Sequence, residues 1–163
     1  MKKLARKDNP PKWKEKRMVI MEKRIILAVF IIRKLIENDK VTDKTKSKTI
    51  DVFKLPRNKK QITPMNFWDI DEIYDYQNES EIKISITDLS NVCIHSRILY
   101  LTIDETGNWD FLLVTSDFKQ EQYLLKIPVS GLIDIFETVI TDYPTIISIA
   151  WNEEKGKYEK TTE

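Results

Sequence analysis

The sequence predicts an α+β domain. It should hold a long N-terminal helix and two short helices, followed by an antiparallel β-meander of four to five strands with one packed amphipathic helix. Three observations favour this class. Apolar residues recur at helical spacing over residues 13–39, β-forming residues dominate three segments between residues 98 and 127, and a second helical stripe follows over residues 130–141. At 163 residues the chain is long enough to bury a core.

The first predicted element is one long helix over residues 13–39. Its apolar positions follow the i, i+3, i+4, i+7 spacing of one helical face: Met18, Met21, Ile25, Ala28, Val29, Ile32, Leu35 and Ile36. Ile20, Leu27, Phe30 and Ile31 widen this face until the middle of the helix is apolar nearly all round. We therefore expect more than one neighbour to cover residues 25–32, with Ile25, Phe30 and Ile32 as candidate interaction residues.

Residues 40–60 lose this periodicity and are rich in Lys and Arg. We interpret them as a solvated connector with a short apolar anchor at Ile50, Val52, Phe53 and Leu55. The alternative is a segment that contacts the phosphates of a nucleic acid. Its candidate residues are Lys44, Lys46, Lys48, Arg57, Lys59 and Lys60.

Two short helices and a strand are expected next. Thr63 and Pro64 suit the cap and first turn of a helix whose inner stripe would be Phe67, Ile70, Ile73 and Tyr74. Residues 81–84 alternate as a short strand does. A second helix is predicted over residues 86–96, with Ser85 and Asp88 suited to a variant of the capping box.

The remaining elements are mostly strands. Residues 98–104 and 109–116 are rich in β-formers, and the sequence Glu-Thr-Gly-Asn between them is typical of a hairpin loop. A third strand is predicted over residues 122–127, and Pro128 begins the packed helix, which ends at Tyr143–Pro144. Residues 146–151 and 157–160 are predicted to be the fourth and fifth strands.

Charge is distributed unevenly along the chain. Residues 1–60 hold 20 Lys and Arg against 7 Asp and Glu, a net charge of +13, whereas residues 61–163 hold 7 against 19, a net charge of −12. We accordingly divide the chain into a flexible basic tail (1–12), a basic helix and connector (13–60) and an acidic α+β domain (61–163). We expect the opposed charges to be compensated within the protein or across a contact with another protein chain.

Residue counts exclude several classes of site. One cysteine, Cys93, leaves no internal disulfide and no thiolate zinc site, and one histidine leaves no site that needs two imidazoles. Gly107, Gly131 and Gly156 stand alone, so phosphate loops and dinucleotide fingerprints are excluded. We expect no cofactor and no bound metal.

Two local groups invite a chemical interpretation. Asn91 and His95 are four residues apart on a predicted helix, where the amide of Asn91 would orient the imidazole for acid–base chemistry. Asp71 and Asp75 belong to an acidic helix face that suits a basic protein segment better than a cation. We favour a structural role for His95 and a docking role for the two carboxylates.

The most apolar run, residues 25–32, is too short to span a bilayer and lacks the features of a signal peptide. We therefore expect no membrane contact and a cytoplasmic protein. The favoured function is a small non-catalytic interaction or adaptor subunit, binding a protein partner or a second copy of itself. Alternatives are a nucleic-acid-binding protein using residues 1–60 and a small hydrolase or nuclease centred on His95.

Overall fold

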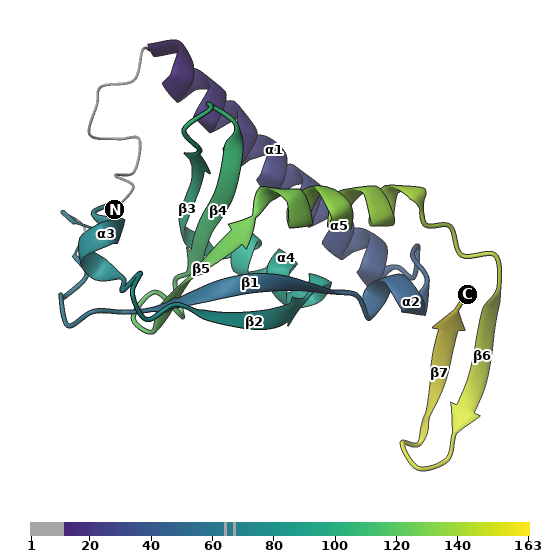
Figure 1. Ribbon diagram of the computed structural model, residues 1–163. Coiled ribbons are helices and arrows are strands. Elements are labelled where there is room, and N and C mark those ends of the chain that lie inside the picture. The colour runs from purple at the N-terminus through teal and green to yellow at the C-terminus, as the bar shows by residue number, and fades with distance from the viewer. Residues whose placement is uncertain (1–11, 64, 67) are drawn as a thin grey trace.

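The computed structural model describes residues 12–63, 65–66 and 68–163, with side chains of the first helix described from Lys16 onward. A five-stranded antiparallel sheet in the order β2-β1-β5-β4-β3 forms its centre, and a separate ribbon of β6 and β7 extends from it (Figure 1). This confirms the α+β class. The helices are α1 (Lys12–Glu37), α2 (Asp43–Lys46), α3 (Ile70–Ile73), α4 (Ile86–Ile94) and α5 (Val129–Thr141). The strands are β1 (Thr49–Pro56), β2 (Ser80–Ser85), β3 (Ser96–Ile103), β4 (Trp109–Ser116), β5 (Tyr123–Pro128), β6 (Ile147–Asn152) and β7 (Lys157–Thr162).

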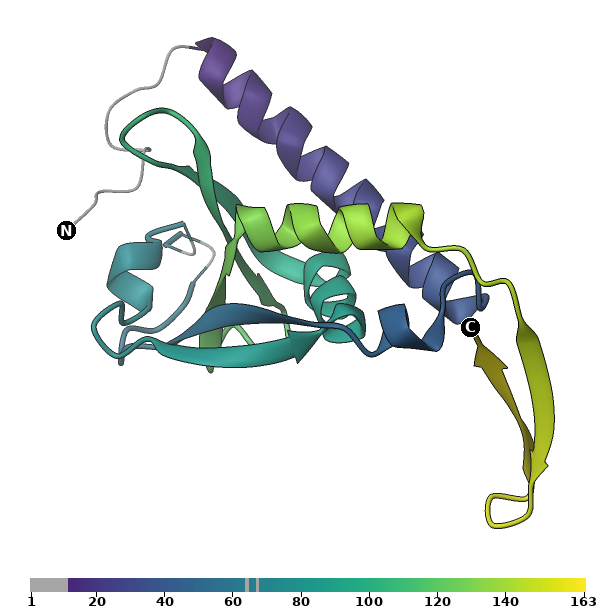
Figure 2. The ribbon, with the colours of Figure 1, turned by 45° about the vertical axis from the view of Figure 1, so that its right-hand side comes forward.

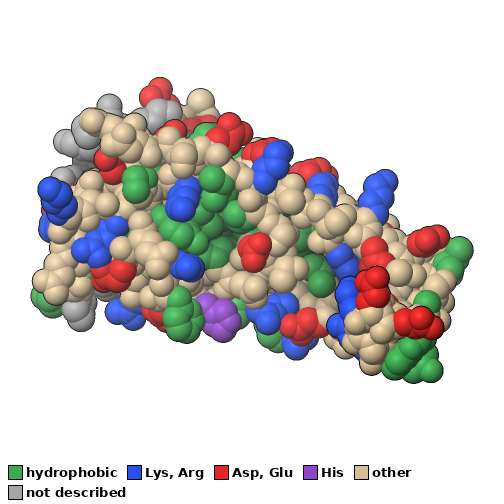
Figure 3. Space-filling view, turned by 90° about the horizontal axis from the view of Figure 1, so that it is seen from below, with side chains coloured by type: hydrophobic (Ala, Val, Ile, Leu, Met, Phe, Trp, Pro, Cys, Tyr) green, Lys and Arg blue, Asp and Glu red, His purple; other side chains and the backbone are tan. Residues whose placement is uncertain are grey.

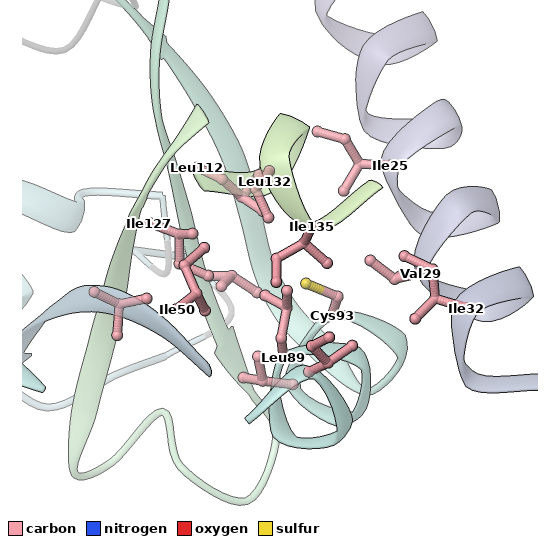
Figure 4. Close-up of a cluster of buried hydrophobic side chains, with 14 of the residues drawn as sticks. Ile25, Val29, Ile32, Ile50, Leu89, Cys93, Leu112, Ile127, Leu132 and Ile135 are labelled. Carbon is pink, nitrogen blue, oxygen red and sulfur yellow. The ribbon is translucent and has the colours of Figure 1, made fainter. Parts of the chain in front are cut away.

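Apolar clusters cover both faces of the sheet. On one face α1, α4 and α5 pack over the strands, and Ile25, Val29 and Ile32 of α1 point toward Leu132 and Ile135 of α5 and toward the sheet (Figure 4). The segment that contains α3 closes the opposite face with a second cluster. Its buried members are Leu55, Ile70, Ile73, Tyr74, Ile98, Leu113 and Leu124.

The long helix forms as expected, and within one copy of the chain residues 25–32 are covered on one side only. Ile25 and Ile32 are only 5% and 4% exposed, whereas Phe30 is 47% exposed and Leu27 is 60% exposed. The inward face meets α4, β3 and α5, and the N-terminal half rests on the β3–β4 hairpin, where the Arg17 guanidinium lies 5.7 Å from the centroid of the Trp109 ring. No described element covers the outward face.

The interpretation of residues 40–60 as a solvated connector is wrong for part of this segment. Residues 49–56 form β1, which pairs with β2 on one side and β5 on the other. Ile50 and Val52 enter the cluster under the helices, and Leu55 enters the opposite cluster. The proposed apolar anchor is therefore an inner strand, and the basic and acidic parts of the chain share one sheet.

The helix predicted from residue 63 onward is mostly absent from the described residues. The backbone N–H of Thr63 donates to Asn66 Oδ1 at 2.7 Å, and the N–H of Met65 donates to Thr63 Oγ1 at 3.3 Å. Such side-chain bonds favour a turn over a helix. Helical structure appears only in α3, where Ile70 and Ile73 are buried as expected; the predicted contributions of Pro64 and Phe67 lie outside the described residues.

The other predicted elements are confirmed within one or two residues. Ser85 caps α4, since its Oγ accepts the backbone N–H of Asp88 at 3.0 Å. Gly107 takes a φ of +87° in the β3–β4 loop, a conformation that favours glycine. The strands β6 and β7 form where expected, but they pair only with each other and stay outside the five-stranded sheet. The basic tail expected over residues 1–12 lies outside the described residues up to Lys12, the first residue of α1.

Candidate functional site

A shallow hollow of about 370 Å³ opens beside α4, on the helix-covered face of the sheet. Its floor is apolar, and the single histidine of the chain lies at its edge (Figure 3). The lining comes from β2, from α4 and its C-cap, from the end of β4 and the segment that follows it, and from β5. It comprises Ile82, Ile84, Asp88, Asn91, Val92, His95, Ser116, Phe118, Lys119, Tyr123 and Leu125.

His95 and Asn91 both line this hollow, on the same side of α4, as their spacing predicts. His95 is exposed and forms the C-cap of the helix, where its backbone N–H donates to the Asn91 carbonyl at 3.1 Å. The side-chain oxygen of Asn91 accepts a hydrogen bond from the Arg33 guanidinium of α1. Among the described residues, none forms a hydrogen bond with the His95 ring, so the orienting contact that a general base requires is not made here.

Tyr123 forms the aromatic part of the floor. The Lys54 ammonium lies 4.6 Å from the centroid of its ring, within the range of a cation–π interaction. Burial, aided by the nearby Asp88 carboxylate, raises the pKa of the Tyr123 hydroxyl above its usual range. The phenol is therefore neutral at pH 7, and the floor of the hollow is suited to apolar contact.

The candidate phosphate-binding residues are largely engaged with carboxylates. Lys46 Nζ lies 2.8 Å from both Asp39 and Asp43, and Lys48 Nζ lies 2.8 Å from Asp134. Arg57 pairs with Glu121, and Lys60 pairs with Glu72. Lys44 and Lys59 are exposed. Three of these six cations thus meet carboxylates of the acidic part of the chain.

Lys46 lies at the centre of a cluster of paired charges that includes Asp39, Asp43 and Lys160. The Lys46 ammonium and the backbone N–H of Thr162 both donate to Asp43, which lowers the pKa of that carboxyl to about 2. Thr162 Oγ1 donates to the Val41 carbonyl at 2.9 Å, and Lys160 pairs with Asp39 at 2.9 Å. These contacts fasten the base of the β6–β7 ribbon to the end of α1 and to α2.

The candidate interaction residues separate into different environments. Ile25 and Ile32 face the core, so a partner would meet Phe30, whose ring centroid lies 6.0 Å from the Lys34 ammonium. Asp71 is exposed on α3. Asp75 lies beyond the end of α3 and accepts the Gln77 backbone N–H at 2.8 Å and the Asn78 amide at 2.7 Å, which lowers the pKa of the Asp75 carboxyl.

An exposed apolar surface lies on α1, at positions where the sequence led us to expect cover by a neighbour. The outward face of α1, called here the outer face, presents six side chains that are 38–60% exposed: Val19, Ile20, Ile26, Leu27, Phe30 and Ile31. A second surface lies on the ribbon, where Ile147, Ile149, Trp151 and Tyr158 are 54–71% exposed. The alternation of apolar residues in 147–151 predicts a strand with one apolar face, but it does not show that this face would be exposed to solvent.

No protein family, curated protein or solved structure matches this chain. The fold therefore defines it only as an α+β domain with a five-stranded antiparallel sheet and a separate ribbon. Among the described residues, no helix is long and apolar enough to cross a membrane. Within the same residues, no three His, Cys, Asp or Glu side chains are grouped so that they could hold a metal ion.

Proposed function

We propose that this protein is a non-catalytic interaction subunit that binds another protein chain through the outer face of α1. One observation carries the proposal: six large apolar side chains lie on one side of α1 at 38–60% exposure. A contiguous exposed apolar surface of this kind marks an interaction site in soluble domains, whereas single exposed apolar residues do not.

The environment of the outer face supports this proposal. The opposite side of α1 is fixed in the core by Ile25, Val29 and Ile32, so the helix offers the face on a rigid support. Lys34 is exposed one turn beyond Phe30 and would form part of the polar rim of an interface, and the exposed Lys23 lies between Val19 and Leu27 on the same side of the helix. The ion pairs of Lys48, Arg57 and Lys60 with acidic residues of the same chain favour protein binding over nucleic-acid binding, because they leave fewer cations for phosphates.

We further propose that the protein acts in the cytoplasm. The support is chemical: its one cysteine, Cys93, is buried, and burial raises the pKa of the thiol to about 12. A chain that uses no disulfide for its stability suits a reducing compartment.

The test compares the assembly of the wild-type protein with that of the double variant Leu27→Ser, Phe30→Ser. Sedimentation of the purified protein measures self-association, and cross-linking followed by capture from the source cell measures binding of other proteins. We expect the double variant to keep its thermal stability and to lose the assembly. Ile133→Ser is the matched control, because Ile133 is 50% exposed but lies on α5. Assemblies that survive the double variant unchanged would refute the proposal.

A further inference from the structure

The ribbon of β6 and β7 extends away from the rest of the molecule, beyond the C-terminal end of α1 (Figures 1 and 2). Cross-strand neighbours Ile147 and Thr162, Ile149 and Lys160, and Trp151 and Tyr158 lie on one face of it. We call Ile147, Ile149, Trp151 and Tyr158 the arm face. Its four side chains are 55%, 66%, 54% and 71% exposed.

The direction of the ribbon is fixed at its base. Thr162 is 1% exposed and bonds to both Val41 and Asp43, and Lys160 pairs with Asp39. Lys46 Nζ also donates to Thr162 Oγ1 at 3.2 Å, and the described contacts of the ribbon with the rest of the chain lie near this base. An isolated two-stranded hairpin is marginally stable in water, and aromatic side chains on one face are typical of the centre of a protein interface. The arm face is therefore built for a surface that this copy of the chain does not supply.

The outer face of α1 matches the arm face in length. From Val19 to Ile31 the helix rises about 18 Å, and from Ile147 to Trp151 the strand rises about 14 Å. Both surfaces are apolar stripes of similar extent. In one chain they cannot meet, because the ribbon points away from the end of its own α1 (Figure 2).

The charges at the two ends are also compatible. The turn of the ribbon exposes Glu153, Glu154 and Lys157, while Lys155 there pairs with Glu159, so a small excess of negative charge remains. The N-terminal half of α1 exposes Lys16, Lys23 and Arg24. If the base of an arm lies at Ile31 of another copy, its acidic turn lies near the basic end of that helix.

We propose that the arm face of one copy packs along the outer face of α1 of a second copy, and that the exchange is reciprocal around a two-fold axis. Each copy then gives one arm and receives one, so the assembly closes as a dimer without leaving an unpaired arm. This inference rests on the proposed function, since it names a second copy of this chain as the partner of the outer face.

The first test is the oligomeric state of matched variants, measured by sedimentation across a concentration series. We expect a wild-type dimer and a weakening of dimerisation by roughly a hundredfold or more in Trp151→Ser, Tyr158→Ser, because buried aromatic anchors dominate such interfaces. Tyr143→Ser is the control: Tyr143 is 81% exposed but lies outside the arm, so this variant should dimerise normally. A mixture of the arm variant with Leu27→Ser, Phe30→Ser should regain one arm-to-helix contact and associate more strongly than either variant alone.

The second test is a disulfide between copies. Leu27→Cys mixed with Ile149→Cys should form a cross-linked heterodimer on mild oxidation, and either variant alone should form much less. Cys93 is 1% exposed and does not compete in this assay.

The results separate the inference from the proposed function. A dimer that persists in the arm variant and is lost in the α1 variant overturns the inference and leaves the proposed function standing. A wild-type protein that stays monomeric at all concentrations also overturns the inference, and the outer face is then open to a different protein. A dimer unaffected by either pair of substitutions overturns the inference, and the proposed function is refuted as well if binding of other proteins also survives Leu27→Ser, Phe30→Ser.

Discussion

Trp151 and Tyr158 face each other across the β6–β7 ribbon, with ring centroids 5.0 Å apart and planes inclined by 70°. This edge-to-face pair contributes about 0.5–1.5 kcal/mol beyond the area that it buries. It lies near the outer end of the ribbon, far from the contacts of Thr162 at the base. The ribbon is thus held at both ends, which lowers the cost of ordering it when a partner binds.

The two sides of α1 should respond differently to truncation. Ile25 is 5% exposed and its neighbour Ile26 is 42% exposed. We expect Ile25→Ala to lower the free energy of unfolding by about 2–5 kcal/mol, because it leaves a cavity in the core. Ile26→Ala should cost less than about 1 kcal/mol in the monomer. Denaturant unfolding of the two variants measures both values.

Phe30→Ala extends this comparison to an aromatic residue. A fully buried phenylalanine would cost about 3–5 kcal/mol on truncation, but Phe30 is 47% exposed. We expect a loss below about 1 kcal/mol at a protein concentration where the chain is monomeric. A loss as large as that of Ile25→Ala would mean that the outer face is covered within one copy.

His95→Ala should leave the fold almost unchanged. The side chain is exposed at the end of α4, and only its backbone N–H takes part in the cap. We expect a change in unfolding free energy within about 0.5 kcal/mol, as for other surface substitutions. Thermal unfolding measures this directly, with Val92→Ala as the control that loses a buried contact. A large loss of stability in His95→Ala would restore the structural role that the sequence favours.

Local patterns were enough to predict most elements. The Ser85 cap, the loop around Gly107 and the stripe that begins after Pro128 all depend on residues close together in the chain. In such short-range signals, the residues that are recognised in the sequence are the same residues whose local interactions form the element. This is why α4, β3, β4, β5 and α5 appear where the sequence predicts them.

Features that depend on distant residues could not be predicted in the same way. Residues 49–56 become an inner strand because β2 and β5 supply hydrogen bonds on both sides. The Lys and Arg residues on either side of this segment made it resemble a solvated connector in the sequence. The apolar middle of α1 shows that one side must be buried, but only packing decides which neighbours exist. Likewise, nothing near Asn91 in the sequence indicates that its side-chain oxygen accepts a hydrogen bond from Arg33.

The anchor of the ribbon should be sensitive to acid. The pKa of Asp43 is lowered to about 2 by Lys46 and Thr162, whereas the pKa of an aspartate in an unfolded chain is about 3.9. Its stabilising contribution is therefore complete above the unfolded pKa and is lost as the pH falls through the folded pKa. Asp43→Asn should lower the melting temperature at pH 7, and its difference from the wild type should shrink between about pH 5 and pH 2.

The control for this prediction is Asp51→Asn. Asp51 pairs with Lys83 on the surface, with side chains 55% and 67% exposed, so its loss should cost about 0–1 kcal/mol. Melting curves over the pH series for both variants provide the measurement. If the gap between Asp43→Asn and the wild type is constant down to pH 2, Asp43 does not hold the ribbon as an ionised group.

Residues 40–60 should bind nucleic acid weakly, because their own chain already neutralises most of the candidate cations. Lys46, Lys48, Arg57 and Lys60 are held by carboxylates, and Lys44 and Lys59 remain as exposed cations of that set. If this segment makes two phosphate contacts, the logarithm of affinity should fall with the logarithm of salt concentration with a slope of about 2 on duplex DNA. Titration of labelled single- and double-stranded oligonucleotides at low and physiological salt measures the slope.

The double variant Lys44→Gln, Lys59→Gln should remove this contribution to nucleic-acid binding, whereas the charge-matched control Lys119→Gln, Lys157→Gln should not. Two exposed cations are too few for micromolar binding at physiological salt. If binding of that affinity is nevertheless observed and depends on Lys44 and Lys59, nucleic-acid binding would replace protein binding as the favoured function.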